Sequence, residues 1–271
     1  MHSRSSIRLA LVAAVVCLTA GAAYAQTQTE QKPFEPTVGQ AGKDVVWVPS
    51  PQTLVDKMLE MAQVTPRDYL IDLGSGDGRT VITAAKRGTR ALGIEYNSDM
   101  VELSKKSAAE AKVGDLATFV KADIFESDFS KATVITLFLL PELNMRLRPK
   151  LLDLAPGIRI VSNSFKMEEW QPDESFTVSD TCTSYCTAHL WIIPAKVAGA
   201  WRLAQGDLTL TQEFQMITGT LGATPIANGR LRGNEITFTV GDAQYTGRVN
   251  GSSIQGTVKG GTGGAWSATR P

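Results

Sequence analysis

The stretch YLIDLGSGDGRT, at residues 69–80, limits the possible folds of this chain more than any other feature. An apolar run ends in three glycines spaced two apart, Gly74, Gly76 and Gly78, and a segment with helical character follows them. Glycines between a buried strand and a helix let the backbone approach a ligand at the carboxyl edge of a parallel sheet. The stretch therefore predicts an α/β fold with a ligand site above this loop.

Repeated β-α units surround this loop between residues 44 and 196. Strands are predicted at residues 69–73, 91–96, 117–123, 134–140 and 158–165. Their runs of Val, Ile and Leu do not alternate with polar residues, which is typical of strands buried on both faces of a parallel sheet. Segments 175–180 and 189–195 are too close for a crossover helix, so we expect them to pair antiparallel. These features predict a doubly wound, mostly parallel sheet of the Rossmann-like kind.

Local signals predict where the helices begin and where one is interrupted. Ser50 and Pro51 predict an N-cap and a first helical residue, and Ser98 is a cap candidate for the helix that follows the second strand. Pro149 lies inside the predicted helix at 141–155, which we expect it to kink or split.

Carboxylates at the ends of the first three strands indicate which ligand the loop holds. Asp72 precedes the first glycine, Glu95 ends the second strand and Asp123 follows the third. Asp77 lies between the last two glycines, and two carboxylates at the loop, Asp72 and Asp77, would repel the pyrophosphate of a dinucleotide. They favour instead the sulfonium and ammonium groups of S-adenosylmethionine. Glu95 is placed for both ribose hydroxyls and Asp123 for the adenine amino group. The predicted cofactor residues are Asp72, Gly74, Ser75, Gly76, Gly78, Glu95, Asp123 and Ile124.

Several motifs resemble a known family. DLGSGDGRTVITAAKRG, GIEYN and ADIF resemble the class I S-adenosylmethionine-dependent methyltransferases. VWVPSPQTLVDKML, LLPELNMRLRPKLL and RIVSNSF are similar to the ATP-synthase c-subunit lysine methyltransferases and the histone lysine methyltransferases that lack a SET domain. The resemblance covers residues 44–195. It implies that residues 48–50 close over the cofactor and that five residues hold it: Asp72, Gly74, Gly76, Glu95 and Asp123.

The acceptor side of the site is less defined by the sequence. The Asn/Asp-Pro-Pro-Tyr signature of amino- and amide-nitrogen methyltransferases is absent, and LFLLPELN stands in its place. No residue is an obvious general base, so catalytic residues remain unassigned. The candidates for the substrate channel are Pro49, Leu140, Pro141, Ser162 and Asn163.

Residues 1–25 have the pattern of a secretory signal peptide. Arg4 and Arg8 precede an apolar core, and Ala23-Tyr24-Ala25 places small residues where signal peptidase cleaves. We expect cleavage after Ala25, an exported, periplasmic or secreted protein, and no transmembrane segment afterwards. Residues 26–43 are polar, which predicts a flexible leader.

The composition of the mature chain excludes several classes of site. Removing two arginines leaves 25 basic against 27 acidic residues, a formal charge of −2, so no basic surplus predicts a nucleic-acid partner. Of the two histidines only His189 lies beyond the signal, so a His-rich metal site is excluded and we expect no metal.

Residues 197–271 differ in character from the rest. Short alternating segments rich in Gly and Thr predict a small antiparallel β domain, a meander or partly closed barrel whose first and last strands pair. Two roles are compatible with this domain. It could bind a partner in the cell envelope, or it could only pack against the rest of the protein.

Cys182 and Cys186 are candidates for a disulfide across the tip of the terminal hairpin. Three residues separate them, and a three-residue hairpin loop would place its flanking positions opposite each other, within disulfide range. Two buried free thiols are the alternative.

The sequence therefore predicts an S-adenosylmethionine-dependent methyltransferase. Its acceptor is a protein, with lysine as the candidate nitrogen, or a small molecule. An exported, non-enzymatic binding protein that reuses the pocket is the alternative from a different class. An export signal conflicts with a cofactor made in the cytosol, and the sequence does not resolve that conflict.

Overall fold

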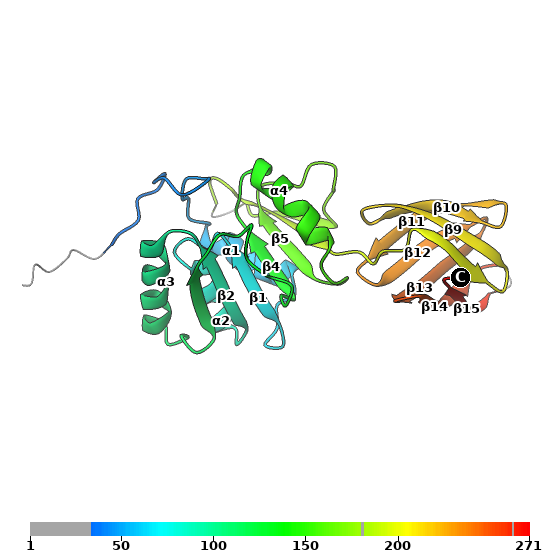
Figure 1. Cartoon of the computed structure of the whole chain (residues 1–271), viewed down its shortest axis with the longest axis horizontal. Coiled ribbons are helices and arrows are strands. Elements are labelled where there is room, and N and C mark those ends of the chain that lie inside the picture. The colour runs from blue at the N-terminus through cyan, green and yellow to red at the C-terminus, as the bar shows by residue number, and fades with distance from the viewer. Residues whose placement is uncertain (1–33, 180–181, 262) are drawn as a thin grey trace, which may run out of the picture. The chain divides into compact units, whose positions relative to one another are not determined.

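The computed structural model describes residues 34–179, 182–261 and 263–271 (Figure 1). Residues 34–271 belong to one compact unit. The expected signal peptide, at 1–25, and the leader up to residue 33 lie outside the described residues.

A seven-stranded sheet forms the first part of this unit, counted over the described residues, in the order β3-β2-β1-β4-β5-β7-β6. Its strands are β1 (Tyr69–Leu73), β2 (Arg90–Glu95), β3 (Ala117–Lys121), β4 (Val134–Leu137), β5 (Arg159–Asn163), β6 (Glu174–Thr177) and β7 (Thr187–Ile192). The first five are parallel, and β7 pairs antiparallel with both β5 and β6. The predicted doubly wound sheet with a terminal hairpin is confirmed. Chain connections diverge on either side of β1, which makes its carboxyl end the ligand-binding position of such folds.

Four helices cover the two faces of the sheet within the described ranges. They are α1 (Gln52–Met61), α2 (Arg79–Lys86), α3 (Ser98–Glu110) and α4 (Pro141–Leu152). Apolar residues of α1, α2 and α3 share one buried core with the sheet, and those of α4 share a second core on the other face. None of these helices combines the length and apolar character that a membrane crossing requires.

The helix termini differ from three expectations. Pro51 occupies the N-cap of α1, and Ser50 Oγ instead accepts a hydrogen bond of 2.9 Å from Asn163 Nδ2. Asn97, and not Ser98, caps α3, because its side chain accepts from the backbone N–H of Asp99 at 2.8 Å. Pro149 does not split α4, which continues to Leu152 as one helix.

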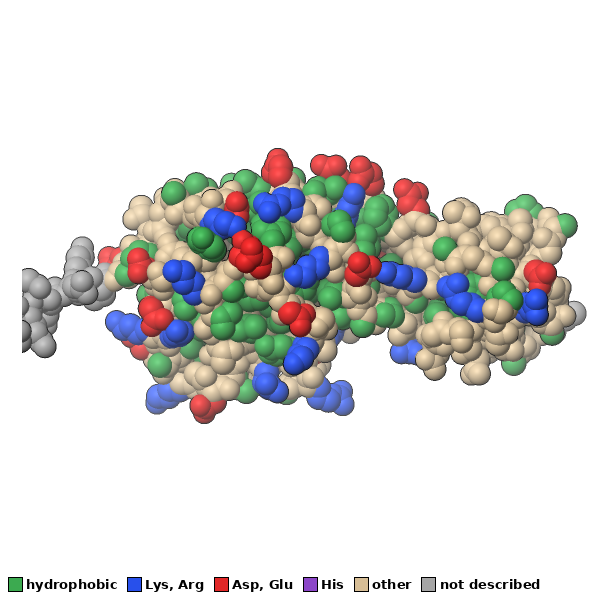
Figure 2. Space-filling view, in the orientation of Figure 1, with side chains coloured by type: hydrophobic (Ala, Val, Ile, Leu, Met, Phe, Trp, Pro, Cys, Tyr) green, Lys and Arg blue, Asp and Glu red, His purple; other side chains and the backbone are tan. Residues whose placement is uncertain are grey.

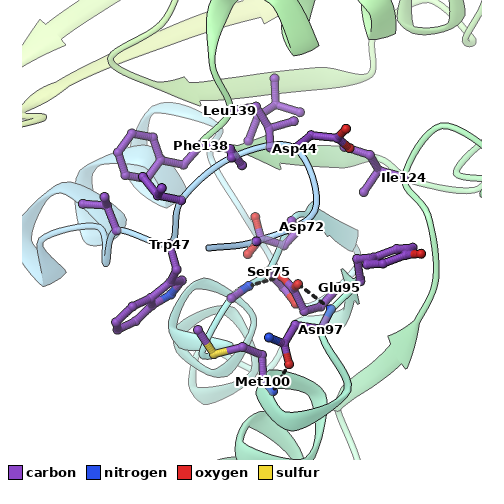
Figure 3. Close-up of a pocket in the computed structure, with 18 of the residues that line it drawn as sticks. Asp44, Trp47, Asp72, Ser75, Glu95, Asn97, Met100, Ile124, Phe138 and Leu139 are labelled. Carbon is purple, nitrogen blue, oxygen red and sulfur yellow. Dashed lines mark hydrogen bonds between the residues drawn. The ribbon is translucent and has the colours of Figure 1, made fainter. Parts of the chain in front are cut away.

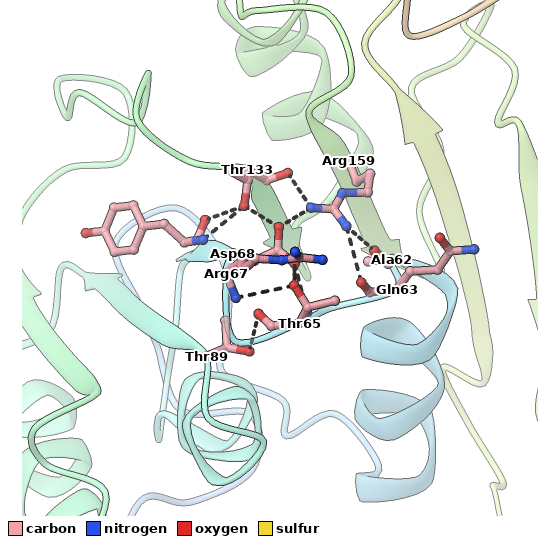
Figure 4. Close-up of polar contacts among 9 residues, drawn as sticks. Ala62, Gln63, Thr65, Arg67, Asp68, Thr89, Thr133 and Arg159 are labelled. Atoms are coloured by element: carbon pink, nitrogen blue, oxygen red, sulfur yellow. Dashed lines mark hydrogen bonds and ion pairs between the residues drawn. The ribbon is translucent and has the colours of Figure 1, made fainter.

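A polar network fixes the amino-terminal edge of the sheet (Figure 4). The carboxylate of Asp68 accepts from Thr133 Oγ1 at 2.7 Å and from Thr65 N at 2.8 Å, and it also pairs with the guanidinium of Arg159. Arg159 Nη1 reaches Ala62 O at 2.8 Å. The network ties the loop after α1 to the starts of β1, β4 and β5, at the edge opposite the predicted ligand loop.

Residues from 199 onward form a closed barrel, as counted over the described residues, coloured yellow to red in Figure 1. Its strands are β8 (Gly199–Leu203), β9 (Gly206–Glu213), β10 (Met216–Leu221), β11 (Thr224–Arg232), β12 (Glu235–Val240), β13 (Ala243–Asn250), β14 (Ser253–Lys259) and β15 (Gly264–Thr269). β15 pairs with β8, so the expected pairing of first and last strands is confirmed. Within the barrel, Gly256 allows β14 to lie close to β13, because a Cβ there would lie 1.9 Å from Thr246 O.

Side chains of the barrel also contact the sheet domain. Phe214, in the turn between β9 and β10, stacks on Trp170 with ring centroids 6.0 Å apart. Gln215 Nε2 donates to Gln171 O at 2.7 Å, and Arg230 pairs with the buried Asp173 at 2.7 Å. The sheet and the barrel, on either side of the boundary predicted near residue 196, therefore share a contact surface.

Charged side chains of both signs lie on the face of the molecule drawn in Figure 2. Lys and Arg are interspersed with Asp and Glu over the middle of this face, and several acidic side chains lie along its upper edge.

Candidate cofactor and acceptor site

A pocket opens at the carboxyl ends of β1, β2, β3 and β4 (Figure 3). Its wall is formed mainly by residues 40–50, 74–77, 95–97, 122–124 and 137–140. Seven of the eight predicted cofactor residues line it, and Gly78 is the exception.

The glycine loop requires its glycines for two different reasons. Gly74, Gly76 and Gly78 all have positive φ, at 78°, 52° and 78°. A Cβ on Gly76 would lie 2.7 Å from Trp47 Nε1, so this glycine allows the Trp47 ring to pack against the loop at the pocket wall. A Cβ on Gly78 would lie 2.7 Å from the ring of Phe119. Gly78 therefore serves the packing of α2 against the sheet and not the pocket wall.

Asp72 is a buried carboxylate at the end of β1. It is 6% exposed, and its Oδ1 accepts a hydrogen bond of 2.6 Å from Thr136 Oγ1 on β4. Burial, aided by the nearby charges of Glu95 and Asp77, raises the pKa of Asp72 to about 7. A positively charged group in the pocket would stabilise the ionised carboxylate.

Glu95 is held rigidly at the end of β2. Its Oε2 accepts from the N–H of Gly76 and its Oε1 from the N–H of Asn97, both at 2.9 Å. The glycine loop and the start of α3 thus orient one carboxylate, and each oxygen keeps a lone pair for a ligand hydroxyl.

Asp123 follows β3 and has partners on both oxygens. Oδ1 accepts from the N–H of Phe125 at 2.9 Å, and Oδ2 pairs with Lys43 Nζ at 2.5 Å. The hydrogen bond from Lys43, more than any other contact, lowers the pKa of Asp123. Ile124 lines the pocket beside it.

Lys43 belongs to a segment for which the sequence predicted a flexible leader. Residues 37–47, here called the strap, are held by backbone hydrogen bonds from Gly39 N to Trp47 O at 2.8 Å and from Trp47 N to Gln40 O at 2.9 Å. Ala41 and Val46 form an antiparallel bridge. Figure 3 shows the strap, with Asp44 and Trp47, beside Asp72. The residues expected to cover the cofactor, 48–50, line the pocket together with the strap.

Comparisons with known proteins identify this arrangement. The family model of the ANTKMT methyltransferase domain matches residues 72–174. A protein-lysine N-methyltransferase of Saccharolobus islandicus (strain REY15A) is 41% identical over 152 residues, which cover 55% of this chain and 94% of that protein. The chain belongs to this family of S-adenosylmethionine-dependent methyltransferases. The resemblance drawn from the sequence motifs is confirmed.

Two further relatives extend the comparison of this methyltransferase. The ATP-synthase c-subunit lysine N-methyltransferase of Mus musculus is 35% identical over 130 residues, 48% of this chain and 52% of that protein. The crystal structure of an RNA methyltransferase from Salinibacter ruber in complex with S-adenosyl-L-homocysteine is 46% identical, with a TM-score of 0.52, and covers 55% of this chain and 96% of that one. S-adenosylmethionine is therefore the cofactor, whereas the relatives' names differ in the acceptor.

The pocket of this methyltransferase fits that cofactor. The hydroxyl of Ser75 is buried in the glycine loop and has no hydrogen-bond partner among the described residues. Gly74 and Gly76 line the pocket beside it. S-adenosylmethionine carries no phosphate that the acids of the pocket would repel.

The five acceptor-channel candidates separate into two groups. Pro49 and Leu140 line the pocket. Pro141 is the first residue of α4, and Ser162 and Asn163 are fully buried behind the wall. Their position at the end of a strand predicted exposed side chains for Ser162 and Asn163. However, β5 is an inner strand of the sheet, and the chain before α1 covers its end.

Aromatic residues of the pocket were not predicted from the sequence, and three of them lie at its β4–β5 end. Phe138 follows β4, Phe165 follows β5, and Tyr185 lies in the loop between β6 and β7. Phe138 was visible inside LFLLPELN, and Phe165 at the end of RIVSNSF. No local pattern associates Tyr185 with them.

Tyr185 lies between two bonded cysteines. Cys182 and Cys186 form a disulfide with an Sγ–Sγ distance of 2.04 Å. The expected geometry, a three-residue hairpin loop, is wrong. Thr177 pairs with Thr187, and Val178 N donates to Cys186 O, so residues 178–186 lie between the paired strands. The disulfide closes a small ring inside this longer loop.

Proposed function

We propose that this methyltransferase methylates the ε-amine of a protein lysine. The observation that carries the proposal is the apolar wall beyond Asp72, formed by Phe138, Leu139 and Leu140. A lysine ammonium that enters there loses water, which lowers its pKa and favours release of the proton to give the neutral, nucleophilic amine. Names of relatives support the same acceptor, since both the Saccharolobus and the mouse protein are lysine N-methyltransferases.

The acids divide the cofactor between them in this proposal. Asp72 would hold the methionine ammonium, Glu95 would accept hydrogen bonds from the ribose hydroxyls, and Asp123 would accept from the adenine amino group beside Ile124. The fixed orientation of Glu95 and the burial of Asp72 support these roles.

The transfer needs positioning more than acid-base chemistry. When bound, S-adenosylmethionine supplies an electrophilic methyl group on a sulfonium. The lysine first gives a proton to solvent. Its neutral nitrogen would then take the methyl group beside the wall of Phe138, Leu139 and Leu140, and the C–S electron pair would remain on sulfur. The protein aligns the two reactants and excludes water.

We further propose that the mature protein begins after Ala25 and is exported. The pattern of residues 1–25 motivates this, and a disulfide between Cys182 and Cys186 is typical of an oxidising compartment. In that setting the C-terminal barrel would be available to bind an envelope partner. N-terminal sequencing of the protein from the envelope fraction tests the proposal, and an intact signal in mature protein contradicts it.

Methyl transfer from methyl-labelled cofactor into envelope and cytosolic fractions tests the function. We expect label in mono-, di- or trimethyllysine, identified by mass spectrometry, and at least tenfold less label with Glu95→Ala at a cofactor concentration below saturation. Label in nuclease-sensitive material would overturn the lysine assignment and favour an RNA acceptor, the class named for the Salinibacter protein.

A further inference from the structure

The pocket has two chemically different halves. The acids lie at the ends of β1, β2 and β3, which are neighbouring strands in one half of the sheet. Phe138, Phe165 and Tyr185 lie at the ends of β4 and β5 and beside the start of β7, on the other side. The junction of the halves is the β1–β4 boundary, where Asp72 meets Thr136.

The three rings contact one another as a group, here called the aromatic box. Ring centroids of Phe138 and Tyr185 are 5.1 Å apart, and those of Phe165 lie 6.1 Å from each of the other two. A cation within about 6 Å of an aromatic centroid is attracted by the ring, and several rings bind ammonium and methylammonium groups together.

Buried polar groups hold Phe165 in place. Its carbonyl oxygen accepts from Ser162 Oγ at 2.7 Å and from Asn144 Nδ2 at 3.3 Å. Both of these side chains are fully buried. Two walls of the box are therefore built on the ends of sheet strands.

Tyr185 is held differently. It is 41% exposed, has a φ of +56°, and lies in the ring that Cys182 and Cys186 close. A bulky residue rarely adopts this left-handed conformation, so the surroundings must impose it. The carbonyl of Cys186 is anchored by Val178 N at 2.9 Å, and the covalent bond to Cys182 restricts the rest of the loop.

We propose that the aromatic box is the binding site for the acceptor's ammonium group and that the Cys182–Cys186 disulfide keeps it assembled. This assignment rests on the proposed lysine acceptor. A dithiol reductant gives two electrons and two protons to the bond, which leaves two thiols and an oxidised reductant. Tyr185 is then free to leave its left-handed conformation, and the box loses its third wall. The cofactor half, on β1, β2 and β3, is unchanged.

The test uses mature protein saturated with S-adenosylhomocysteine and titrated with tetramethylammonium, followed by NMR of the aromatic side chains. We expect saturable binding to the oxidised protein, and about three- to thirtyfold weaker binding after reduction and in Tyr185→Ala. Tyr185→Phe should bind like the wild type. Phe176→Ala removes an exposed ring that does not line the pocket and serves as the control. The neutral isostere tert-butanol should not compete.

Parallel measurements separate the two proposals. Equal tetramethylammonium binding by oxidised and reduced protein, each with unchanged affinity for S-adenosylhomocysteine, would overturn the role of the disulfide. Lysine methylation with an unchanged KM in Tyr185→Ala would overturn the box and leave the proposed function standing. Label in RNA would overturn the proposed function, whatever the box binds. Reoxidation of the same sample must restore binding, which excludes unfolding as the cause.

Discussion

Lys43 and Asp123, 80 residues apart in the chain, form an ion pair of 2.5 Å at the pocket, and the Lys43 ammonium also lies 5.1 Å from the centre of the Tyr96 ring. The hydrogen bond with Asp123 raises the pKa of Lys43 and lowers that of Asp123, so both groups stay charged at neutral pH. Both oxygens of Asp123 are engaged before any adenine arrives.

This pair predicts competition between the strap and the cofactor. Lys43→Ala should bind S-adenosylhomocysteine about two- to fivefold more tightly, because the Lys43 ammonium no longer occupies the space at Asp123 Oδ2 where the adenine amino group would bind. Calorimetry measures the change. Lys105→Ala, which removes an exposed lysine paired with Glu102 on α3, is the control. Weaker binding in Lys43→Ala would mean that Lys43 contacts the cofactor itself.

Glu95→Ala should weaken cofactor binding at least tenfold. The substitution removes charge-assisted hydrogen bonds of about 1.5–3 kcal/mol each and releases the N–H groups of Gly76 and Asn97. Glu102→Ala, on the exposed face of α3, should leave the dissociation constant unchanged. An unaltered affinity in a folded Glu95→Ala protein would exclude Glu95 from the site.

Asp72 should make cofactor affinity depend on pH. Its pKa of about 7 means that the carboxylate must lose a proton to pair with a cationic ligand. Affinity should fall by up to tenfold per unit as pH drops below about 7, and level off above it. Asp72→Asn should flatten this dependence. Calorimetry in buffers of different ionisation enthalpy should show proton release near pH 6, and its absence would contradict the assignment.

Asp72 also makes the free energy of unfolding depend on pH, and this dependence has the opposite sign: its contribution to stability is larger at low pH. Because the folded protein keeps a proton on Asp72 that the unfolded chain loses, its contribution is fully present below the ordinary aspartate pKa of 3.8 that the unfolded chain has. That contribution is lost as pH rises to about 7. Urea unfolding of the wild type and Asp72→Asn at pH 5.5 and 7.5 should show a smaller decline with pH for the variant.

Asp68→Asn should destabilise the fold without changing the site. Burial alone would raise the pKa of Asp68, but hydrogen bonds from Thr133, Thr65 and Arg159 outweigh it and lower the pKa. The stabilisation is therefore present above the unfolded pKa and lost as pH falls. We expect a loss of about 1.5–3 kcal/mol in the free energy of unfolding at pH 7. Asp153→Asn, in a pair with Lys196 that is exposed on both sides, should cost much less.

Phe214→Ala should loosen the contact between barrel and sheet domain. It removes the ring stacked on the fully buried Trp170, at a cost of about 1–3 kcal/mol. Met216→Ala, two residues away and 48% exposed, is the matched control. Equal thermal midpoints for the two variants would show that the contact contributes nothing to stability.

The sequence by itself determined the features that depend on local pattern. Unbroken apolar runs predicted β1 and β4, and glycines beside Asp72 predicted the ligand loop. Glu95 could be placed because strands of a parallel sheet end at one edge. Alternation and turn residues likewise predicted that β15 would return to β8.

Only the tertiary structure decided which distant residues meet. Lys43, in the strap, pairs with Asp123, and Tyr185, in the loop before β7, contacts Phe138. The local sequence of neither segment predicts which residue it contacts. Asn163 was predicted to face a substrate and instead donates to Ser50, because the end of β5 is covered by the chain before α1. Contacts of this kind follow from packing and long-range hydrogen bonds, and periodicity within one segment does not encode them.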